Sequence, residues 1–289
     1  MLIDKRLLLH IGLMAHNEEE NIGRLLKKLI KLASDGDIDV NITVVTSGCT
    51  DKTQEIVRSF AEIYPCVKLI NEKQRKGKAC AINLFLKQAR GDILIISSAD
   101  VVPSDNVLTA FIRVFSDLSI GMVGGRPLPN PSTGLVGRLN EMLWELHHEV
   151  ALSKPKLGEF VAIRNIVDAI PDDTAADEAS LEAVVTQKGY SIKYLPEVLI
   201  YNNAPKDIRT FVRVRTRVFM GHIFVKQRMF YRVSTYQFIP LAYLMVKKIC
   251  LERRKIFIAL LLACLEVYAR GAAVFNFCVK KQTNAVWTR

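Results

Sequence analysis

Short apolar runs alternate with stretches of helical period through the first 125 residues of the chain. The runs are rich in Val and Ile and apolar at nearly every position, which is typical of strands covered on both faces of a sheet. The stretches between them are long enough for amphipathic helices. This alternation predicts an α/β nucleotide-binding type of fold with a mostly parallel central sheet. The expected strands are Leu7–Met14, Val40–Thr46, Val67–Ile70, Ile93–Ser97 and Ile120–Gly124, and the expected helices are Glu18–Ala33, Asp51–Tyr64, Lys78–Ala89 and Asp105–Phe115.

The pattern loosens after Gly125 but still predicts structure as far as residue 203. Pro127–Pro131 is expected to be a loop because of its three prolines. We therefore predict an α/β domain over residues 1–203, followed by a helical region over residues 204–289. The further elements expected in the first domain are helices at Gly134–Leu152 and Ala175–Lys188 and strands at Glu159–Arg164 and Tyr190–Tyr201.

Polar loops follow the first four expected strands. They cover residues 15–21, 47–51, 72–78 and 98–100. Ligands of open α/β sheets bind outside the carboxyl ends of the strands, so the residues just after each strand are the ones that can contact a ligand. We therefore expect these four loops to meet at one edge of the sheet and to form a binding site.

Two aspartates in these loops have a functional and a structural interpretation. Asp100 follows the apolar strand Ile93–Ser97, where a carboxylate can hold Mg²⁺ or Mn²⁺ against a diphosphate, since hard cations prefer oxygen ligands. The alternative for Asp100 is a helix N-cap or turn aspartate. Asp51 is a candidate nucleotide contact, but a structural role at a helix N-terminus is favoured for it.

Two further polar segments also have structural alternatives. Asn17 and Glu20 are spaced as a helix capping pair, with Glu18 in the first helical turn. Lys78 opens the third expected helix, where backbone N–H groups and a lysine can approach a phosphate. An ordinary solvated turn is the alternative for Lys78.

The combination of these segments resembles the family 2 glycosyltransferases, which have the GT-A fold. The resemblance implies an inverting transfer of a sugar from a nucleotide-diphosphate sugar, a UDP- or GDP-sugar, to a hydroxyl acceptor, which is lipid-linked or part of a cell-envelope glycan. The matching segments are residues 15–22, 47–53, 76–83, 98–103, 176–181, 189–190 and 194–196.

The resemblance also implies roles for individual residues. The loop after the first strand and the loop after the second strand of the family seat the nucleotide, and a later element binds the diphosphate through a divalent cation, Mn²⁺ or Mg²⁺. Asp100 is the implied metal ligand. The residues implied to bind the nucleotide sugar are Ala15, Asn17, Glu18, Ser47, Asp51, Lys78 and Ser98.

Two positions depart from the family pattern. Ser98 stands where the metal-binding element usually has its first Asp, and Ser47 stands where Asp is common. A single carboxylate can still ligate a metal together with the donor diphosphate. We therefore expect a weaker affinity for metal.

Asp177 and Glu178 form an acidic pair at the start of an expected helix. The resemblance implies that this pair supplies the general base, which takes the proton of the acceptor hydroxyl. Register relative to Leu181 favours Glu178, whereas residue type favours Asp177, so both are candidate catalytic residues. The structural alternative is that acidic residues favour a helix N-terminus.

Arg209, Arg213 and Arg217 recur every four residues and so share one helical face. Guanidinium groups suit diphosphate recognition, which makes Arg213 and Arg217 candidates for nucleotide-sugar binding. A basic face on lipid headgroups is the alternative. Residues 213–218 lack the Gln-x-x-Arg-Trp element that is common in the family, which disfavours a processive polysaccharide synthase.

Other potential metal or proton-transfer residues are interpreted as structural. His147 and His148 lie on an expected helix and are read as ordinary core or surface histidines. The six cysteines include no Cys-x-x-Cys pair, so they do not indicate a zinc site and are read as reduced core residues.

The formal net charge of +11 belongs to the C-terminal region. Residues 204–289 hold 17 Lys and Arg against three acidic residues, a balance of +14, whereas residues 1–203 have a balance of −3. The basic residues flank the apolar stretches 236–246 and 256–279, a pattern that favours anionic lipids over nucleic acid. We expect a membrane-associated protein whose partners are membrane lipids or a lipid-linked acceptor, with its catalytic domain in the cytoplasm.

The second apolar stretch is long enough to cross a bilayer at about 1.5 Å per residue. It contains Glu266 and Arg270, however, and ionisable groups within a span are costly. The two are four residues apart and can pair on one helical face. A spanning helix, a hairpin and an in-plane amphipathic helix all remain open.

Two other classes of protein have less support from the sequence. A catalytically inactive, membrane-docked scaffold of the same fold is the first alternative, because Ser47 and Ser98 replace carboxylates. A nucleotidyltransferase is less well supported, because the loop at residues 15–20 is acidic and has no glycine.

Overall fold

The computed structural model describes residues 7–236 and 255–279 of the chain. A mixed, eight-stranded sheet forms its centre, with the strand order β3-β2-β1-β4-β7-β6-β8-β5. The strands are β1 (Leu9–Ala15), β2 (Val40–Ser47), β3 (Val67–Glu72), β4 (Ile93–Ser98), β5 (Val102–Pro103), β6 (Ile120–Pro129), β7 (Phe160–Arg164) and β8 (Ser191–Asn202).

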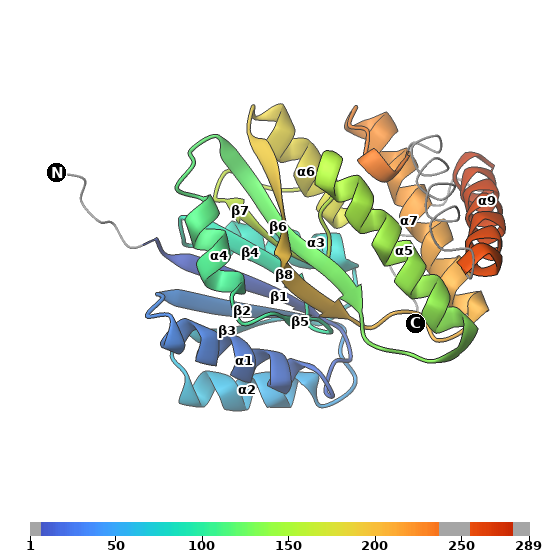
Figure 1. The fold of residues 1–289 in the computed structure, drawn as a ribbon. Helices are drawn as coiled ribbons and strands as arrows, with labels where there is room; N and C mark the ends of the chain where they lie inside the picture. Colours follow the sequence, from blue (N-terminus) through green and yellow to red (C-terminus); the bar gives the residue numbers. More distant parts are fainter. Residues whose placement is uncertain (1–6, 237–254, 280–289) are drawn as a thin grey trace.

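Helices connect these strands and cover both faces of the sheet (Figure 1). Their apolar faces bury residues against the sheet, as their sequence period predicts. They are α1 (Ile22–Asp35), α2 (Thr53–Ile63), α3 (Lys78–Gln88), α4 (Val107–Val114), α5 (Gly134–Ser153) and α6 (Asp177–Gln187). After the last strand follow α7 (Ile208–Arg228), the 3₁₀ turn η1 (Ser234–Tyr236) and α9 (Ile256–Cys278).

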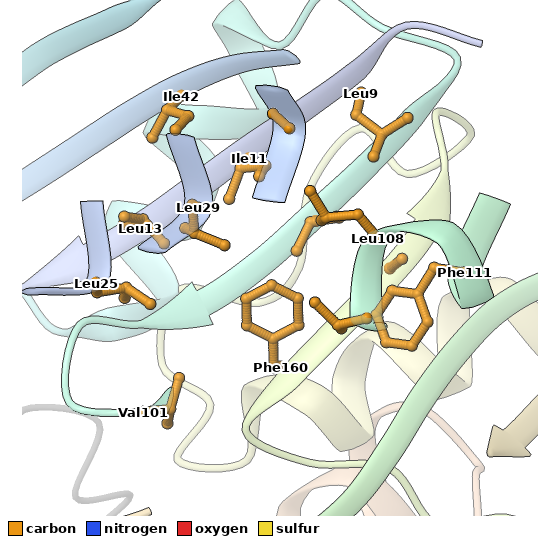
Figure 2. Packing of buried hydrophobic residues seen from close by; sticks show 14 of the residues in the cluster. Leu9, Ile11, Leu13, Leu25, Leu29, Ile42, Val101, Leu108, Phe111 and Phe160 are labelled. Carbon is orange, nitrogen blue, oxygen red and sulfur yellow. The ribbon is translucent and has the colours of Figure 1, made fainter. Parts of the chain in front are cut away.

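The first half of the sheet is the predicted parallel βαβ arrangement. Strands β3, β2, β1 and β4 pair in parallel, in that order. Leu9, Ile11 and Leu13 of β1 face a core formed with α1, α2 and α4, part of which Figure 2 shows, whereas Met14 faces the opposite core with α3 and α6. A strand buried on both faces must be apolar throughout, which explains the continuous apolar runs in the sequence.

The second half of the sheet is reversed in part. Strand β7 pairs antiparallel with both β4 and β6, while β6 and β8 are parallel to each other. Phe160, at the start of β7, therefore lies opposite Ser97, at the end of β4. The first residues of β7 are thereby brought to the edge of the sheet at which the parallel strands end.

The C-terminal helices pack against the end of this domain. Helix α9 lies beside α7 and contacts α5 (Figure 1). Leu139 and Leu146 of α5, Phe211 of α7 and Leu262 of α9 share one apolar cluster. The apolar stretch predicted at 236–246 lies outside the described residues, apart from Tyr236.

Several element boundaries differ from those expected. Helix α1 begins at Ile22 and not at Glu18, and no side chain caps its N-terminus. The interpretation of Asn17 and Glu20 as a capping pair is therefore wrong. Strand β6 continues through Pro129, where a loop was expected, because its outer part pairs with β8. The expectation of core cysteines is also wrong for those that the structure describes, because Cys49, Cys66 and Cys80 are half-buried and Cys264 and Cys278 are exposed on α9.

Candidate active site

A cavity of about 760 Å³ opens at the carboxyl ends of β1, β2 and β4 and extends to α5, α7 and α9. Ten of the twelve residues that the sequence nominates line it, although they come from separate loops and helices. The structure therefore brings together the polar loops as their positions after the strands predict. The ten residues are Ala15, Glu18, Ser47, Lys78, Ser98, Asp100, Asp177, Glu178, Arg213 and Arg217.

The other two nominated residues, Asn17 and Asp51, lie beside the cavity and join two loops. Asn17 has a left-handed backbone, with φ of 55°, and its Oδ1 accepts a hydrogen bond from the Thr50 backbone N–H at 2.9 Å. Asp51 accepts hydrogen bonds from the backbone N–H groups of Glu19, at 3.1 Å, and Thr53, at 3.0 Å. These bonds tie the loop after β1 to the loop before α2.

This bracing fixes the residues at the mouth of the cavity. The backbone N–H of Glu18 donates to Thr53 Oγ1 at 2.7 Å, and the buried Glu18 carboxylate accepts from Asn21 Nδ2 at 2.7 Å. His16 Nδ1 lies 2.7 Å from the carbonyl oxygen of Ser47, whose own hydroxyl donates to Glu72 Oε2 at 2.5 Å. The loops that would contact a nucleotide are thus held in place by hydrogen bonds that involve side chains.

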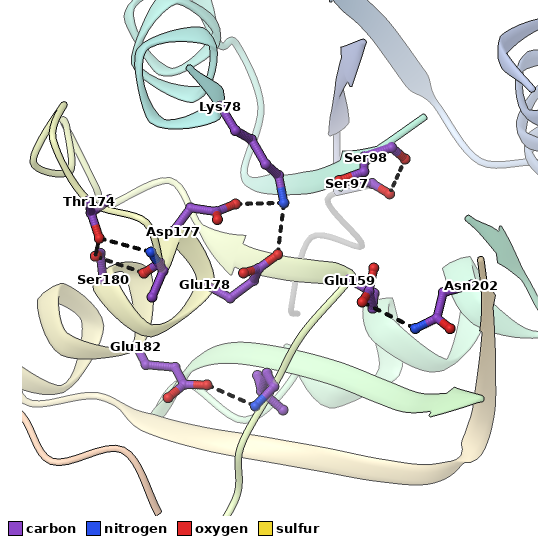
Figure 3. Close-up of polar contacts among 12 residues, drawn as sticks. Lys78, Ser97, Ser98, Glu159, Thr174, Asp177, Glu178, Ser180, Glu182 and Asn202 are labelled. Atoms are coloured by element: carbon purple, nitrogen blue, oxygen red, sulfur yellow. Dashed lines mark hydrogen bonds and ion pairs between the residues drawn. The ribbon is translucent and has the colours of Figure 1, made fainter. Parts of the chain in front are cut away.

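Lys78 contacts both members of the acidic pair in the cavity lining, as Figure 3 shows for their side chains. Its ammonium group lies 2.6 Å from Asp177 Oδ2 and 2.8 Å from Glu178 Oε1. The two acids open α6, and Lys78 opens α3, so two helix N-termini converge at this point. The lysine predicted to contact the donor is therefore also the counter-ion of the candidate base.

The two acids of the pair have different proton affinities. Burial, and the neighbouring charge of Glu178, raise the pKa of Asp177. Burial also disfavours the charged form of Glu178, but the charge and hydrogen bond of Lys78, together with the charge of Lys156, outweigh it and lower the pKa of Glu178 to about 2. The pair thus contains one carboxylate that stays ionised and one that is a stronger base.

Outside the acidic pair, another carboxylate of the site, Glu159, lies close to Asp100 at the edge of the sheet. Burial raises the pKa of Glu159 to about 7, and the negative charges of Asp100 and Glu178 add to the shift. Its Oε1 accepts a hydrogen bond from Asn202 Nδ2 at 3.1 Å (Figure 3). Glu159 has a left-handed backbone, with φ of 69°, which is uncommon for a residue other than glycine.

Sequence reasoning missed Glu159 as a site residue, because its position depends on the reversed strand β7 that follows it. A strand pattern does not reveal strand direction, so only the three-dimensional pairing reveals this neighbour of Asp100. Within residues 7–236 and 255–279, no group of three or more His, Cys, Asp or Glu side chains could hold a metal by itself. A cation at Asp100 and Glu159 would need further ligands from the substrate.

The arginines of α7 approach the cavity unequally. Arg213 and Arg217 line it, whereas Arg209 does not and is exposed. Burial lowers the pKa of Arg217, while the nearby charges of Asp177 and Glu178 oppose the shift. One end of the arginine face therefore adds positive charge next to the acidic pair.

The far end of the cavity is formed by helices and contains more apolar groups. Trp144 and His147 of α5 and Leu262 of α9 are part of its lining. Burial lowers the pKa of His147 to about 3, with a further contribution from the charge of Lys156, so this histidine is neutral at physiological pH. His148, by contrast, is hydrogen-bonded to the Tyr194 hydroxyl at 2.9 Å and does not line the cavity.

A half-parallel sheet with a cavity that charged side chains line at the ends of its strands defines an α/β protein of the nucleotide-binding type. Comparison with known proteins identifies the family within this class. Residues 11–184 match glycosyl transferase family 2, and the chain belongs to this family.

Relatives of the chain include glycosyltransferases from bacteria and archaea. A probable glycosyltransferase, YdaM, of Bacillus subtilis is 26% identical over 231 residues, which cover 73% of this chain and 54% of that protein. Poly-beta-1,6-N-acetyl-D-glucosamine synthase of Staphylococcus aureus is 23% identical over 250 residues, which cover 82% of this chain and 60% of the synthase. The chain thus matches little more than half the length of these two curated relatives.

Solved structures show the same fold. The mannosyltransferase PcManGT of Pyrobaculum calidifontis, in complex with GDP-Man and Mn²⁺, superposes with a TM-score of 0.72 and 22% identity, covering 96% of this chain and 89% of the other. Glucosyl-3-phosphoglycerate synthase of Mycobacterium tuberculosis, in complex with Mn²⁺, UDP and phosphoglyceric acid, gives a TM-score of 0.56 and 18% identity, with 77% and 79% covered. The fold is therefore that of the GT-A glycosyltransferases.

Proposed function

We propose that the chain transfers a sugar from a UDP- or GDP-sugar to a hydroxyl acceptor, with inversion at the anomeric carbon. The observation that carries this proposal is the convergence of Lys78, Asp177, Glu178 and Asp100 on one cavity at the ends of the parallel strands. Family membership and the GDP-Man and UDP complexes of proteins with this fold support a nucleotide-sugar donor.

The donor diphosphate would lie near Asp100 and Glu159. Burial and mutual repulsion disfavour two negative charges there, and carboxylate oxygens are the ligands that Mn²⁺ and Mg²⁺ prefer, so the two side chains suit a divalent cation. Bound between them and the diphosphate, such a cation would supply positive charge against the leaving group. The Mn²⁺ complexes of proteins with this fold support this assignment.

The acidic pair would act on the acceptor. As the acceptor oxygen bonds to the anomeric carbon, Asp177 or Glu178 takes its proton, and the bond to the diphosphate breaks with its electron pair on the phosphate oxygen. Lys78 holds both carboxylates in place. The raised pKa of Asp177 favours it as the base, whereas the larger exposed fraction of the Glu178 side chain, 20% against 8%, gives that residue better access to a substrate.

We further propose that the acceptor is lipid-linked and that the C-terminal part holds the chain on the cytoplasmic face of a membrane. The far end of the cavity reaches α9, which is the one described helix that is long and apolar enough to cross a membrane. An acceptor anchored in lipid would therefore approach the cavity from the side of this helix.

Donor turnover in detergent tests the enzymatic proposal directly. The purified chain would be incubated with Mn²⁺ and each of a set of UDP- and GDP-sugars, and the released nucleotide would be measured. We expect turnover of at least one donor and a loss of about 100-fold in Asp100→Asn, a size typical for the removal of one charge-stabilising group.

The matched control is Asp105→Asn, because Asp105 is an exposed aspartate that pairs with Lys28 at 2.9 Å and lies outside the cavity. This variant should keep the wild-type rate. If no donor is consumed and Asp100→Asn equals the wild type, the chain is an inactive scaffold and the proposal fails.

A further inference from the structure

Helix α9 has two faces of different character. The exposed positions recur along its whole length and carry no charged residue. Phe257 and Tyr268 each expose 66% of their surface, and Phe275 exposes 54%. At 100° per residue these positions form one continuous stripe. The exposed residues are Ile256, Phe257, Leu260, Cys264, Val267, Tyr268, Gly271, Val274, Phe275, Cys278 and Val279.

The opposite face is attached to the catalytic domain from one end of the helix to the other. Ile258, Ala259 and Leu262 pack in the cluster with α5 and α7, and Ala273 is buried against Phe219 and Met220 of α7. A transmembrane helix of a bitopic protein would instead have lipid on every side. One apolar face of α9 therefore packs against the protein, and the other is exposed to its surroundings.

The charged residues of α9 are on this attached face and are paired there. Glu266 forms an ion pair with Arg215 of α7 and lies 3.4 Å from Arg270 Nε. Arg270 also donates hydrogen bonds to the backbone oxygens of Tyr236, at 3.1 Å, and Thr235, at 3.3 Å. Its guanidinium carbon lies 4.6 Å from the centre of the Phe219 ring.

These contacts exclude an isolated span. If α9 crossed the bilayer as described, α7 beside it would enter the hydrocarbon together with Arg213, Lys226 and Arg228, at a cost of about 3 kcal/mol for each charge. If α9 crossed alone, Glu266 would lose Arg215, and Arg270 would lose the backbone oxygens of Thr235 and Tyr236. Neither cost arises when the helix lies along a membrane surface.

The sequence on either side of α9 also suits a surface position. Arg253, Arg254 and Lys255 precede the helix, and Lys280 and Lys281 follow it. Cations at both ends of an in-plane helix can all reach one anionic headgroup layer. A spanning helix would place one of the two clusters in the opposite leaflet, against the usual one-sided distribution of positive charge.

We propose that α9 lies in the plane of an anionic membrane surface, with its exposed stripe in the lipid and its other face forming part of the wall at the far end of the cavity. Leu262, Ala263 and Glu266 line that end, so a lipid-anchored acceptor would approach the cavity from the side of α9. The proposal rests on the membrane association proposed above and gives it an orientation.

Depth measurements along the exposed stripe test this orientation. Nitroxide labels would be placed one at a time at F257C, native Cys264, Y268C and F275C in the full-length chain, with the other cysteines replaced by Ser. Bound to vesicles of phosphatidylglycerol and phosphatidylethanolamine, each label would be compared for its collisions with oxygen and with a water-soluble nickel chelate. The buried position Ala273→Cys, which lies outside the cavity lining, is the control for a label shielded from both.

We expect the four labels to lie at one shallow depth, about 5–10 Å below the phosphates, as for other in-plane helices. A profile that is deepest near Cys264 and Tyr268 and shallow at both ends would show a spanning helix and overturn the orientation alone. Spin–spin broadening without lipid contact would show that a second copy covers the stripe and would also overturn it. Failure to bind vesicles would overturn the orientation and the membrane association together, while donor turnover in detergent would still report on the enzymatic proposal.

Discussion

At the scale of single residues, the site is organised by charges held in fixed pairs. Lys78 contacts both members of the acidic pair, and Glu159 shares the edge of the sheet with Asp100. Asp100 was predictable from the sequence because it follows an apolar strand. Glu159 was not, because its place depends on the direction of β7 and on a left-handed backbone at a non-glycine residue.

The assignment of Glu159 to the metal predicts an effect on affinity that does not depend on turnover. Glu159→Gln should weaken Mn²⁺ binding, measured by electron paramagnetic resonance in the presence of GDP or UDP, by about tenfold or more, since a ligand oxygen loses its charge. The exposed Glu197 supplies the control variant Glu197→Gln, which should bind Mn²⁺ as the wild type does. Equal affinities in the two variants would remove Glu159 from the metal site.

A residue of the core predicts the pH dependence of stability. His10 Nδ1 accepts a hydrogen bond from the Arg90 backbone N–H at 2.8 Å, and its Nε2 lies 2.8 Å from Thr43 Oγ1. Burial, with a smaller effect from Lys68, lowers the pKa of His10 from 6.5 to about 4. Between these values the unfolded chain binds the proton and the folded chain does not, so the free energy of unfolding falls as pH falls from 6.5 to 4.

Denaturant titrations at several pH values would measure this contribution. In His10→Asn, whose amide oxygen can accept from the Arg90 N–H, the loss of stability over this window should be smaller than in the wild type. Identical pH slopes for the two proteins would show that His10 does not couple folding to protons.

At the scale of elements, the helices and strands followed closely from the apolar pattern, whereas their directions and contacts did not. The βαβ half of the sheet was predicted because strands covered on both faces must be apolar throughout. The reversal of β7 and the packing of α9 on α5 depend on contacts between residues far apart in the chain. The pair formed by Glu266 and Arg270 was predicted from its spacing and is confirmed, but its partner Arg215 was not foreseen.

The surroundings of two glycines predict opposite effects on stability when each is replaced by alanine. A Cβ at Gly12 of β1 would lie 2.6 Å from the Phe85 ring, whereas one at Gly271 of α9 would have nothing within 4 Å. Gly12→Ala should lower the free energy of unfolding by about 1–3 kcal/mol through overpacking. Gly271→Ala should raise it by about 0.5–1 kcal/mol, because alanine favours the helix. Thermal unfolding of both variants measures the difference, and equal shifts would contradict the described packing.

Loss of the ion pair between α7 and α9 should lower stability by more than either glycine substitution changes it. Glu266→Gln leaves Arg215 and Arg270 without their shared counter-charge and should destabilise the packing of α9 by about 3 kcal/mol. The exposed Glu141 of α5 supplies the control Glu141→Gln. Hydrogen exchange of the α9 amides should rise in Glu266→Gln and not in the control; unchanged exchange in both would show that the pair does not hold the helix.

At the scale of the whole molecule, the cavity extends from the loops of the α/β domain to the C-terminal helix α9. Its mouth lies at the ends of the parallel strands, among loops tied together by Asn17, Asp51 and Thr53. Its far end lies at α9, in the region of the chain that holds the excess positive charge. This layout suits an enzyme that takes a water-soluble donor at one end and an acceptor from a lipid surface at the other.

The central claim is that the acidic pair held by Lys78 performs chemistry and does not merely stabilise the start of α6. The most direct measurement compares Asp177→Asn and Glu178→Gln with the wild type for donor affinity, thermal unfolding and the rate of transfer at saturating donor. We predict that one of the two loses at least about 100-fold in rate, as expected for the loss of a general base, while it still folds and binds the donor. Wild-type rates in both variants, or a loss of rate that only follows a loss of folding, would contradict the claim.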